Sequence, residues 1–484
     1  MRLMLCHRRM LGICVGGEKE GMDMHSDYMM KTKMFFFKAT HFALSVGLFY
    51  CAWLIFRYNE FPQIKDTGFR YNYLVVGAFA VQLGFFNRTY NSYLFGYMRI
   101  RNLAFQQMLS QLFPMIVIYI AVSIGWNHWN EPNVFAALLA AFILFDIAMA
   151  YLGNLLYFKL NPPRRTLLIY RNKRDRRRFG YVTGKPTERL YRIDKELQFD
   201  GTFEEIRPEL EKDYEAVFVA GLNSHCRNGI LKFCEDKGIR GFFLPHIGDV
   251  IMQGAAHIQA FDSPVMMVRR KTINPEYRVI KRVTDIVFAA IGLILASPVM
   301  LITAACIKLY DHGPVFYRQI RLTRNEKRFQ IIKFRSMRVD AEKDGVARLS
   351  TGEDDDRITP IGKYVRKCRI DELPQLWNIL VGDMSFVGPR PERPEIAEQY
   401  YKTMPDFRLR LQVKAGLTGY AQVYGKYNTD PYEKLEFDLM YINNMGVLTD
   451  LELMFATAGI LFDKESTRGI EKGMTNAVDY EEEP

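Results

Sequence analysis

Long apolar stretches alternate with mixed polar stretches along the chain. Four of the apolar segments approach the roughly 20 helical residues that cross a bilayer about 30 Å thick. The segments lie near residues 35–56, 71–87, 103–125 and 134–158. They predict a four-helix transmembrane bundle over residues 34–158. Four buried helices of a soluble domain are the alternative, but residues 136–150 are almost unbroken by polar side chains.

The basic residues that flank these segments predict their orientation, because Lys and Arg accumulate on the cytoplasmic side of short loops. Their number is 7 in residues 1–38, 3 in 57–70, 3 in 88–102, none in 126–133 and 9 in 159–182. Both ends of the bundle are therefore predicted to lie in the cytoplasm. Residues 1–33 are rich in Met and basic residues, lack the apolar core of a signal peptide, and are predicted to be disordered.

Asp146 is the one acidic residue inside the four apolar segments. An intramembrane carboxylate is a functional-site hypothesis by default. An acid that faces a neighbouring helix near one end of a bundle is an equally common arrangement. Both interpretations stay open at this point.

Residues 159–272 follow a different pattern, in which short β-rich runs alternate with helix-length segments. This pattern predicts a small, Rossmann-like α/β domain. The expected strands are 166–170, 216–220 and 241–244, and the expected helix is 223–236. The turn after the first strand contains no glycine, so the GxGxxG sequence of dinucleotide sites is absent. A scaffold or regulatory role is therefore favoured over nucleotide binding.

A fifth apolar run, at residues 286–307, contains Ser297 and Pro298 near its middle. Proline inside a helix removes an amide donor and clashes with the carbonyl four residues back, at Ile294, so a bend or break is expected. Basic residues flank both ends of the run. We therefore predict a re-entrant helix near residues 283–309 that returns to the cytoplasmic face, with a full crossing as the alternative.

The part of the chain that follows contains the candidate chemistry. A hairpin is predicted over residues 315–333, and Thr359-Pro360 has the form of a helix N-cap followed by proline. The helix that begins there is expected to extend through Asp371 and Glu372. Two carboxylates with several cations nearby suit Mg²⁺ and phosphate oxygens together. A solvated charged face is the alternative that spacing alone favours.

The formal net charge of +11 indicates an anionic partner. Nucleic acid is not expected, because the basic residues cluster beside the apolar segments and the carboxylate pair, and no nucleic-acid-binding motif appears. The seven cysteines form no CxxC pair, which argues against a zinc site or a disulfide scaffold.

Several ordered motifs resemble the bacterial sugar transferase family, also called monotopic phosphoglycosyl transferases. The matching strings are KFRSM at 333–337, DELPQLWN at 371–378, GDMS at 382–385, GPRP at 388–391 and GLTG at 416–419. Together they cover roughly residues 275–465. The four apolar segments and the sheet domain resemble the large subclass of this family. The resemblance implies a membrane protein of α plus α/β class, in which a re-entrant helix anchors an α+β catalytic domain at residues 273–484.

The resemblance also implies residue roles. Asp371 would be the nucleophile that attacks the β-phosphate of a UDP-sugar and expels UMP, and Glu372 would bind or position Mg²⁺. Five cations are expected to bind the substrate: Lys333, Arg335, Arg366, Arg369 and Arg390.

Undecaprenyl phosphate would then accept the sugar phosphate, which initiates exopolysaccharide, capsule or O-antigen synthesis. Such an enzyme is expected in the bacterial inner membrane as a multi-pass protein, with its middle and catalytic domains in the cytoplasm, and a homodimer is an expectation of the subclass. An inactive membrane scaffold is the alternative, and the intact Asp371-Glu372 pair argues against it.

The chain departs from the family pattern at the hairpin turn, which is usually rich in glycine. The turn here reads LTRNEK at 322–327, so Asn325 is expected to supply any left-handed residue. Within the DELPQLWN string, Leu376 and Trp377 are expected to be core residues.

Overall fold

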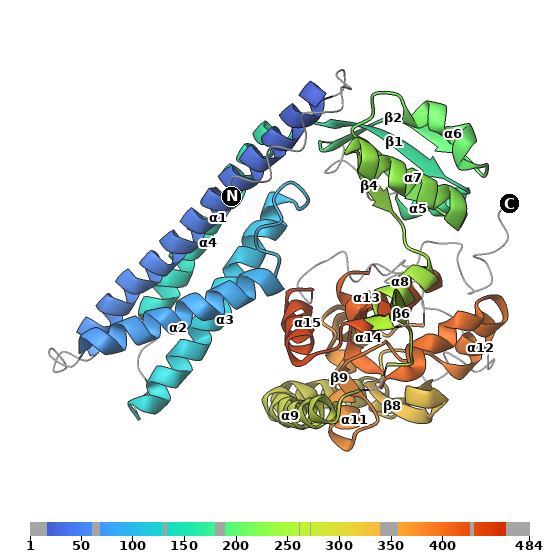
Figure 1. Ribbon diagram of the computed structural model, residues 1–484. Coiled ribbons are helices and arrows are strands. Elements are labelled where there is room, and N and C mark those ends of the chain that lie inside the picture. Colours follow the sequence, from blue (N-terminus) through green and yellow to red (C-terminus); the bar gives the residue numbers. More distant parts are fainter. Residues whose placement is uncertain are drawn as a thin grey trace. The chain divides into compact units, whose positions relative to one another are not determined.

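The computed structural model describes residues 17–60, 68–127, 129, 133–179, 189–260, 262–271, 273–338, 357–425 and 430–460. The chain forms two compact units, Met1–Leu244 and Pro245–Pro484. In the first unit, long helices precede a parallel sheet, and in the second a long apolar helix precedes a mixed arrangement of short helices and strands (Figure 1).

The first unit begins with the helices α1 (Gly17–Glu60), α2 (Gly68–Thr89), α3 (Ile100–Gly125) and α4 (Asn133–Leu160). Each helix packs on the next one along the chain, and α1 also packs on α4, so the four form a closed bundle. Aromatic side chains fill its interior, where Phe49, Trp53 and Phe79 are buried. Apolar side chains such as Val81 and Leu144 are exposed on its outside. Helices that are apolar on all sides are typical of membrane spans.

Helices occupy all four predicted spans, but they are not equally apolar. Among the described residues, the helical segments long and apolar enough to cross a bilayer are Met29–Tyr58, Ile100–Gly125, Asn133–Leu160 and Pro275–Asp311. Helix α2, which covers the predicted span 71–87, is not one of them, because polar residues such as Asn72 and Gln82 interrupt it. The crossing of the bilayer by this second segment stays a prediction.

The N-terminal boundary of the bundle also differs from the prediction. Residues 1–16 lie outside the described residues, and α1 begins at Gly17, inside the stretch 1–33 for which disorder is predicted. The polar part of α1 contains Glu, Lys and Met, which are good helix formers, so the helix extends beyond its apolar part.

A parallel sheet follows the bundle and confirms the predicted small α/β domain. Its strand order is β2-β1-β3-β4, and every neighbouring pair is parallel. The strands are β1 (Arg164–Tyr170), β2 (Tyr191–Gln198), β3 (Ala216–Ala220) and β4 (Arg240–Phe243), and the helices between them are α5 (Lys173–Arg178), α6 (Phe203–Leu210) and α7 (Ser224–Lys237). The sequence did not indicate β2 or α6. The Rossmann-like character of the domain stays a prediction.

Both faces of this sheet are covered, as its apolar strands require. Successive side chains of a strand point to opposite faces. Leu167 therefore packs with Ile206 of α6 and Ile230 of α7, whereas Leu168 packs with Phe179 and Phe218 on the other face.

The second unit begins at Pro245, earlier than the predicted domain boundary at residue 273. The reason is helix α8, whose Val250 is fully buried in the core of this unit and accepts a hydrogen bond from Asn443 Nδ2 at 2.6 Å. The helices are α8 (Ile247–Gln253), α9 (Pro275–Asp311), α10 (Pro360–Lys367), α11 (Gln375–Val381), α12 (Pro394–Thr403), α13 (Tyr420–Val423), α14 (Pro431–Asn443) and α15 (Val447–Ile460).

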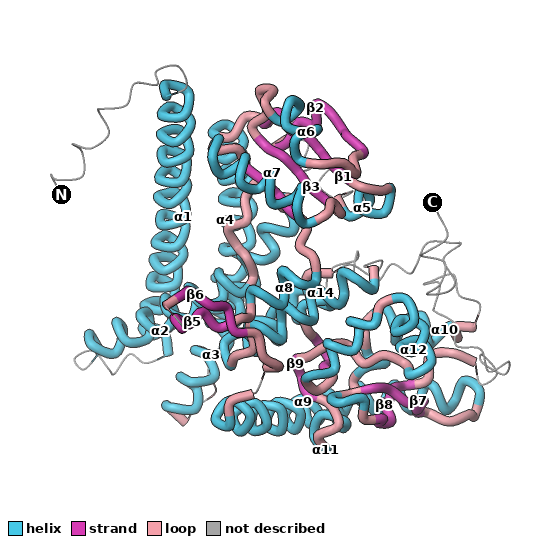
Figure 2. Tube along the Cα trace, turned by 45° about the vertical axis from the view of Figure 1, so that its right-hand side comes forward, coloured by secondary structure: helices cyan, strands magenta, loops and turns pink. Residues whose placement is uncertain are grey.

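The strands of the second unit form small sheets (Figure 2). They are β5 (Ala256–Ala260) and β6 (Ser263–Met267), β7 (Phe316–Leu322) and β8 (Arg328–Phe334), and β9 (Ser385–Val387) and β10 (Gly416–Thr418). The antiparallel pair β7–β8 confirms the predicted hairpin. Asn325 in its turn has φ 56°, the left-handed conformation that the sequence predicts at this position.

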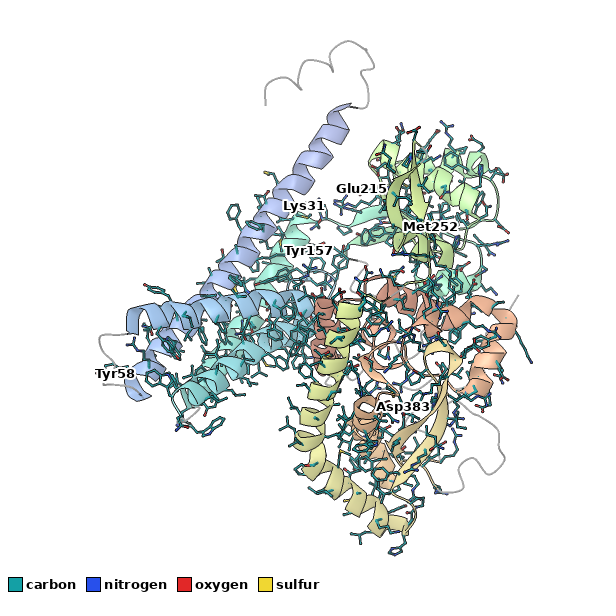
Figure 3. The ribbon with its side chains drawn as sticks, turned by 60° about the horizontal axis from the view of Figure 1, so that its bottom comes forward. Lys31, Tyr58, Tyr157, Glu215, Met252 and Asp383 are labelled. Atoms are coloured by element: carbon teal, nitrogen blue, oxygen red, sulfur yellow. The ribbon has the colours of Figure 1, made fainter. Side chains whose placement is uncertain are left out.

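Helix α9 is continuous through Pro298 and changes direction without a full break (Figure 3). The Ser297 hydroxyl donates a hydrogen bond to the Ile294 carbonyl at 2.7 Å, the group that proline leaves without an amide partner. Both halves of α9 pack on the rest of the unit. Arg282 in the first half donates to the carbonyls of Ile379 and Leu380, and Ile307 in the second half packs with Phe334 and Val365.

Candidate active site

The carboxylate pair lies in a short turn between two helices. Thr359 caps α10 by accepting a hydrogen bond from Gly362 N at 3.0 Å, as predicted. The helix ends at Lys367, because Arg369 adopts the left-handed conformation with φ 55°. Asp371 and Glu372 follow in a 3-10 turn, η3 (Ile370–Glu372). The prediction that one helix extends through both carboxylates was therefore wrong.

Glu372 lies among cations contributed by three separate segments. Arg390 Nη2 donates to Glu372 Oε1 at 2.8 Å, and Lys333 Nζ lies 3.3 Å from the same oxygen. Arg369 Nη1 is 3.7 Å from Glu372 Oε2. The structure thus brings together three of the five predicted substrate-binding cations.

Asp371 has a different environment from its neighbour. It is 8% exposed, and its nearest cation is Lys333, whose Nζ is 4.0 Å from Asp371 Oδ2. Within the described part of the chain, no hydrogen-bond donor contacts its carboxylate. Its oxygens are therefore available to a ligand or a reacting group.

The pKa values of the two carboxylates are shifted in opposite directions. Burial raises the pKa of Asp371 to about 6, although the charges of Lys333, Arg366 and Arg369 act in the opposite direction. Burial also acts to raise the pKa of Glu372, but Arg390, Lys333 and Arg369 outweigh it and hold that pKa well below its usual range. When the pair takes up one proton, Asp371 receives it. Such a separation is typical of two carboxyl groups with different roles.

Lys333 is positioned by the contact between β8 and α11. Asn378 of α11 donates to the Gln330 carbonyl at 2.8 Å and accepts from Ile332 N at 3.0 Å, which fixes the strand one residue before Lys333. A buried side chain that satisfies both a donor and an acceptor of a strand end fixes its register.

Arg390 follows a close approach of two backbone segments. A side chain at Gly416 would collide with the backbone of Gly388, at 2.1 Å from its nitrogen, so the GLTG and GPRP motifs need glycine where they meet. Arg410 donates to the Arg390 carbonyl at 2.9 Å from the other side.

Arg335 and Arg366 are the remaining two predicted cations. Arg335 is 7% exposed and pairs with Asp311 at the end of α9, so its contact is with the membrane-type helix and not with the carboxylate pair. Arg366 acts on Asp371 through its charge. Trp377 is 54% exposed, so its prediction as a core residue was wrong, whereas Leu376 is buried as predicted.

The buried charges behind Arg390 were not predicted from the sequence. Arg410 Nη2 lies 2.8 Å from Asp438 Oδ2, and both side chains are almost completely buried. Burial raises the pKa of Asp438 to about 6. The one available signal was an acid at a core-facing position of the apolar segment that forms α14.

The described residues contain no group of three or more His, Cys, Asp or Glu side chains that would hold a metal ion by themselves. Mg²⁺, however, is usually held by one or two carboxylates together with substrate phosphates. Asp371 and Glu372 supply that number of carboxylates, and no donor in the described part of the chain engages the oxygens of Asp371. The pair therefore fits a Mg²⁺ ion that a phosphorylated substrate helps to bind.

Comparisons with known proteins match the part of the chain that contains this site. Residues 276–464 match the family model described as bacterial sugar transferase. The chain is 38% identical over 191 residues to a UDP-glucose:undecaprenyl-phosphate glucose-1-phosphate transferase of Caulobacter vibrioides, a match of 38% of this chain and 71% of that protein. This chain belongs to the bacterial sugar transferase family.

In two further relatives, the match to this chain covers less than half of the relative's length. A UDP-N-acetylgalactosamine-undecaprenyl-phosphate N-acetylgalactosaminephosphotransferase of Aeromonas hydrophila is 42% identical over 187 residues, 38% of this chain and 44% of that protein. A UDP-glucose:undecaprenyl-phosphate glucose-1-phosphate transferase of Escherichia coli (strain K12) is 40% identical over 211 residues, 43% of each chain. The chain thus spans less than half the length of these two relatives. The family model includes α9 and all five predicted cations, and it leaves the bundle and the parallel sheet outside.

Proposed function

We propose that this chain transfers a sugar 1-phosphate from a UDP-sugar to undecaprenyl phosphate, with Asp371 as the nucleophile, as the first step of polysaccharide synthesis. The observation that carries the proposal is the state of Asp371, a buried carboxylate beside Lys333 that receives no hydrogen bond from the described residues. The names of the relatives support the donor and acceptor classes. They also make glucose and N-acetylgalactosamine the first sugars to test.

The proposed reaction has two displacements at one phosphorus atom. A carboxylate oxygen of Asp371 attacks the β-phosphorus of the UDP-sugar, the bond to the bridging oxygen breaks, and UMP leaves with the electron pair. A sugar-phosphoryl-aspartate remains. An oxygen of undecaprenyl phosphate then attacks the same phosphorus and displaces the Asp371 carboxylate, which regenerates the enzyme.

The cations around Glu372 have a clear role in this reaction. Phosphoryl transfer depends on positioning and on stabilisation of charge at the phosphate oxygens. Lys333, Arg369 and Arg390 lie within 4 Å of the carboxylate pair and would bind those oxygens. A Mg²⁺ ion held by Glu372 and the substrate would neutralise further charge on the phosphates.

The packing of α9 supports re-entry into the membrane and a cytoplasmic active site. A straight helix of 37 residues would be about 55 Å long, enough to cross the bilayer. Arg282 in the first half and Ile307 in the second half nevertheless both contact segments that adjoin the carboxylate pair. A helix with its two ends on opposite sides of the membrane would not allow both contacts.

Residues near the two ends of α9 provide a test of this topology. In a variant without native cysteines, Lys281→Cys and Lys308→Cys should both react with a membrane-impermeant thiol reagent from the cytoplasmic face. Labelling from opposite faces in an active protein would contradict re-entry.

The test of the reaction is UMP release from a panel of UDP-sugars, with Mg²⁺ and with or without undecaprenyl phosphate. We expect a UDP-sugar alone to leave the protein heavier by one sugar phosphate, detected by intact mass spectrometry and absent in Asp371→Asn. A requirement for both substrates before any UMP appears would exclude the covalent intermediate. No UMP from any UDP-sugar would favour the inactive-scaffold alternative.

A further inference from the structure

A pocket of about 650 Å³ in the second unit has no part in the proposed reaction. Four of its lining side chains are cationic, namely Arg269, Arg270, Lys271 and Arg408, whereas Glu326 is its one acid. Apolar side chains from α14 and the neighbouring segments complete the lining. Its volume lies within the range of small-molecule sites.

The pocket is separate from the carboxylate pair. Glu326 lies in the turn of the β7–β8 hairpin, whereas Lys333 lies near the other end of β8. The strand from Arg328 to Lys333 is roughly 17 Å long, at about 3.4 Å per residue. Neither carboxylate of the pair lines the pocket, and none of the three cations around Glu372 does so.

Three of the four cations are held in place by contacts that leave their charge uncompensated or only partly compensated. Arg270 donates to Asn325 Oδ1 at 2.7 Å, and Lys271 donates to the Asn443 carbonyl at 3.0 Å, so both partners are neutral. Arg408 lies over the Tyr401 ring and 3.8 Å from Glu326. Fixed side chains lose less entropy when a ligand binds.

Arg269 has no such partner in the described residues, where no acidic group lies within ion-pair distance of it. Four cations against one carboxylate leave a positive site that favours an anionic ligand. Guanidinium groups match phosphate oxygens in bidentate geometry. The apolar part of the lining favours a ligand whose phosphate is attached to an apolar or aromatic body.

We propose that this pocket binds an organic phosphate, with Arg269, Arg270, Lys271 and Arg408 as its anion-binding residues. Two sources offer that chemistry. Lys271 precedes the first residue of α9 by only a few positions, which places an anionic phospholipid headgroup within reach if α9 enters the membrane. A free nucleotide is the other source, and the experiment separates the two.

Amide hydrogen exchange of the full-length protein in nanodiscs tests the proposal. The reference is phosphatidylcholine without nucleotide, one arm adds UMP, and the other replaces part of the lipid by phosphatidylglycerol. We expect slower exchange at residues 268–271 and 408–412 in one of the two arms. That arm identifies the source of the phosphate. At a probe concentration about ten times its dissociation constant, local opening becomes roughly tenfold rarer.

Matched variants connect that protection to the pocket. Arg269→Ala with Arg270→Ala should abolish it, whereas Lys232→Ala with Lys237→Ala, which removes the same charge from exposed positions of α7, should retain it. A variant with Arg269→Lys and the native Arg270 should retain part of the protection. Protection in neither arm, or protection that persists in the double variant, would overturn the proposal. Protection confined to residues 369–372 and 388–391 would overturn it as well and leave the proposed reaction intact.

Discussion

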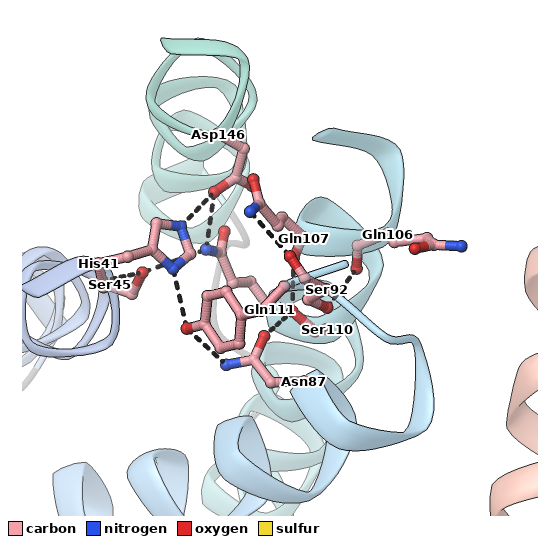
Figure 4. A network of polar contacts seen from close by, with 10 residues as sticks. His41, Ser45, Asn87, Ser92, Gln106, Gln107, Ser110, Gln111 and Asp146 are labelled. Carbon is pink, nitrogen blue, oxygen red and sulfur yellow. Dashed lines mark hydrogen bonds and ion pairs between the residues drawn. The ribbon is translucent and has the colours of Figure 1, made fainter. Parts of the chain in front are cut away.

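Asp146 in the bundle and Asp371 in the second unit are both buried aspartates, but their oxygens are used differently. Asp146 Oδ1 accepts a hydrogen bond from Gln111 Nε2 at 3.0 Å and lies 3.3 Å from His41 Nε2 (Figure 4). Asp371 has no hydrogen bond within the described residues and has only charges nearby. One oxygen of Asp146 is engaged by donors from its own fold, whereas no donor of the described residues engages the Asp371 carboxylate.

The contacts of Asp146 continue into a network that joins all four helices of the bundle. His41 Nδ1 lies 3.0 Å from the Tyr93 hydroxyl, which accepts from Asn87 Nδ2 at 3.2 Å. Buried polar side chains within apolar helices hydrogen-bond across the helix interfaces and stabilise their packing. The structure therefore favours the second interpretation of Asp146, an acid that faces neighbouring helices.

This comparison gives a criterion for reactive acids. A carboxylate that stabilises a fold has its lone pairs engaged by donors, which lowers its nucleophilicity as well as its free energy. A nucleophilic carboxylate needs cations close enough to bind the substrate but too far to engage its own oxygens, as the 4.0 Å between Lys333 and Asp371 allows.

The largest expected effect is that of Asp371→Asn. The amide has nearly the same shape but cannot act as a carboxylate nucleophile, so UMP release should fall by a factor of about 10³ or more. Asp406→Asn is the matched control, because Asp406 is exposed in the same unit. Folding of both variants is checked by thermal denaturation. UMP release by Asp371→Asn within tenfold of the wild type would remove the distinction between the two buried aspartates.

Glu372→Gln should have the next largest effect. The substitution leaves Lys333, Arg369 and Arg390 without their shared carboxylate, so these cations repel one another and lose their positions. We expect a loss of about 10² in kcat and a Mg²⁺ titration displaced to higher concentration. Glu395→Gln, an exposed acid in α12, is the control. An unchanged Mg²⁺ titration would assign the metal to other residues.

The pH dependence tests the environment of Asp371 itself. Because burial raises its pKa to about 6, the carboxylate takes up a proton and loses activity as the pH falls through 6. The rate should therefore decrease about tenfold between pH 7 and pH 5, whereas an ordinary aspartate would remain ionised to about pH 4. Lys333→Gln removes a charge that lowers this pKa, so its midpoint should move to higher pH. A midpoint near 4 in the wild-type profile would contradict the burial argument.

The smallest expected effect on activity is that of Asp146→Asn. The amide oxygen still accepts the hydrogen bond from Gln111, so activity should stay within about threefold of the wild type. Asp146→Leu removes the acceptor from Gln111 and His41 and should lower the free energy of unfolding by about 1 kcal/mol. Thermal denaturation in nanodiscs measures the second effect. A loss of activity in Asp146→Asn similar to that in Asp371→Asn would show a role in the reaction.

The sequence predicts best those features that have local causes. Thr359 and Pro360 specify the start of α10 by their own hydrogen bond and φ angle, and Asn325 adopts the left-handed conformation that its turn requires. The strands β1, β3 and β4 lie on β-rich runs of a recognisable length, whereas β2 was not predicted. In each case the deciding interactions lie within a few residues.

The arrangement of charges in the site could not be predicted in the same way. Arg335 lies two residues after Lys333, yet it pairs with Asp311 while Lys333 contacts Glu372. Which acid an arginine contacts depends on segments that are distant in sequence. The helix end at Arg369 was also missed, because nothing in the residue type requires a left-handed arginine.

On the proposed function, the attachment of both halves of α9 to the unit that contains Asp371 affects how the protein encounters its lipid acceptor. On the proposed topology, the active site remains at a constant height above the bilayer, so the acceptor is found by lateral diffusion in two dimensions while the UDP-sugar arrives from three. The rate should then follow the number of acceptor molecules per area of membrane. Added acceptor-free lipid that mixes with the bilayer should slow the reaction at a constant total amount of acceptor, as surface dilution requires.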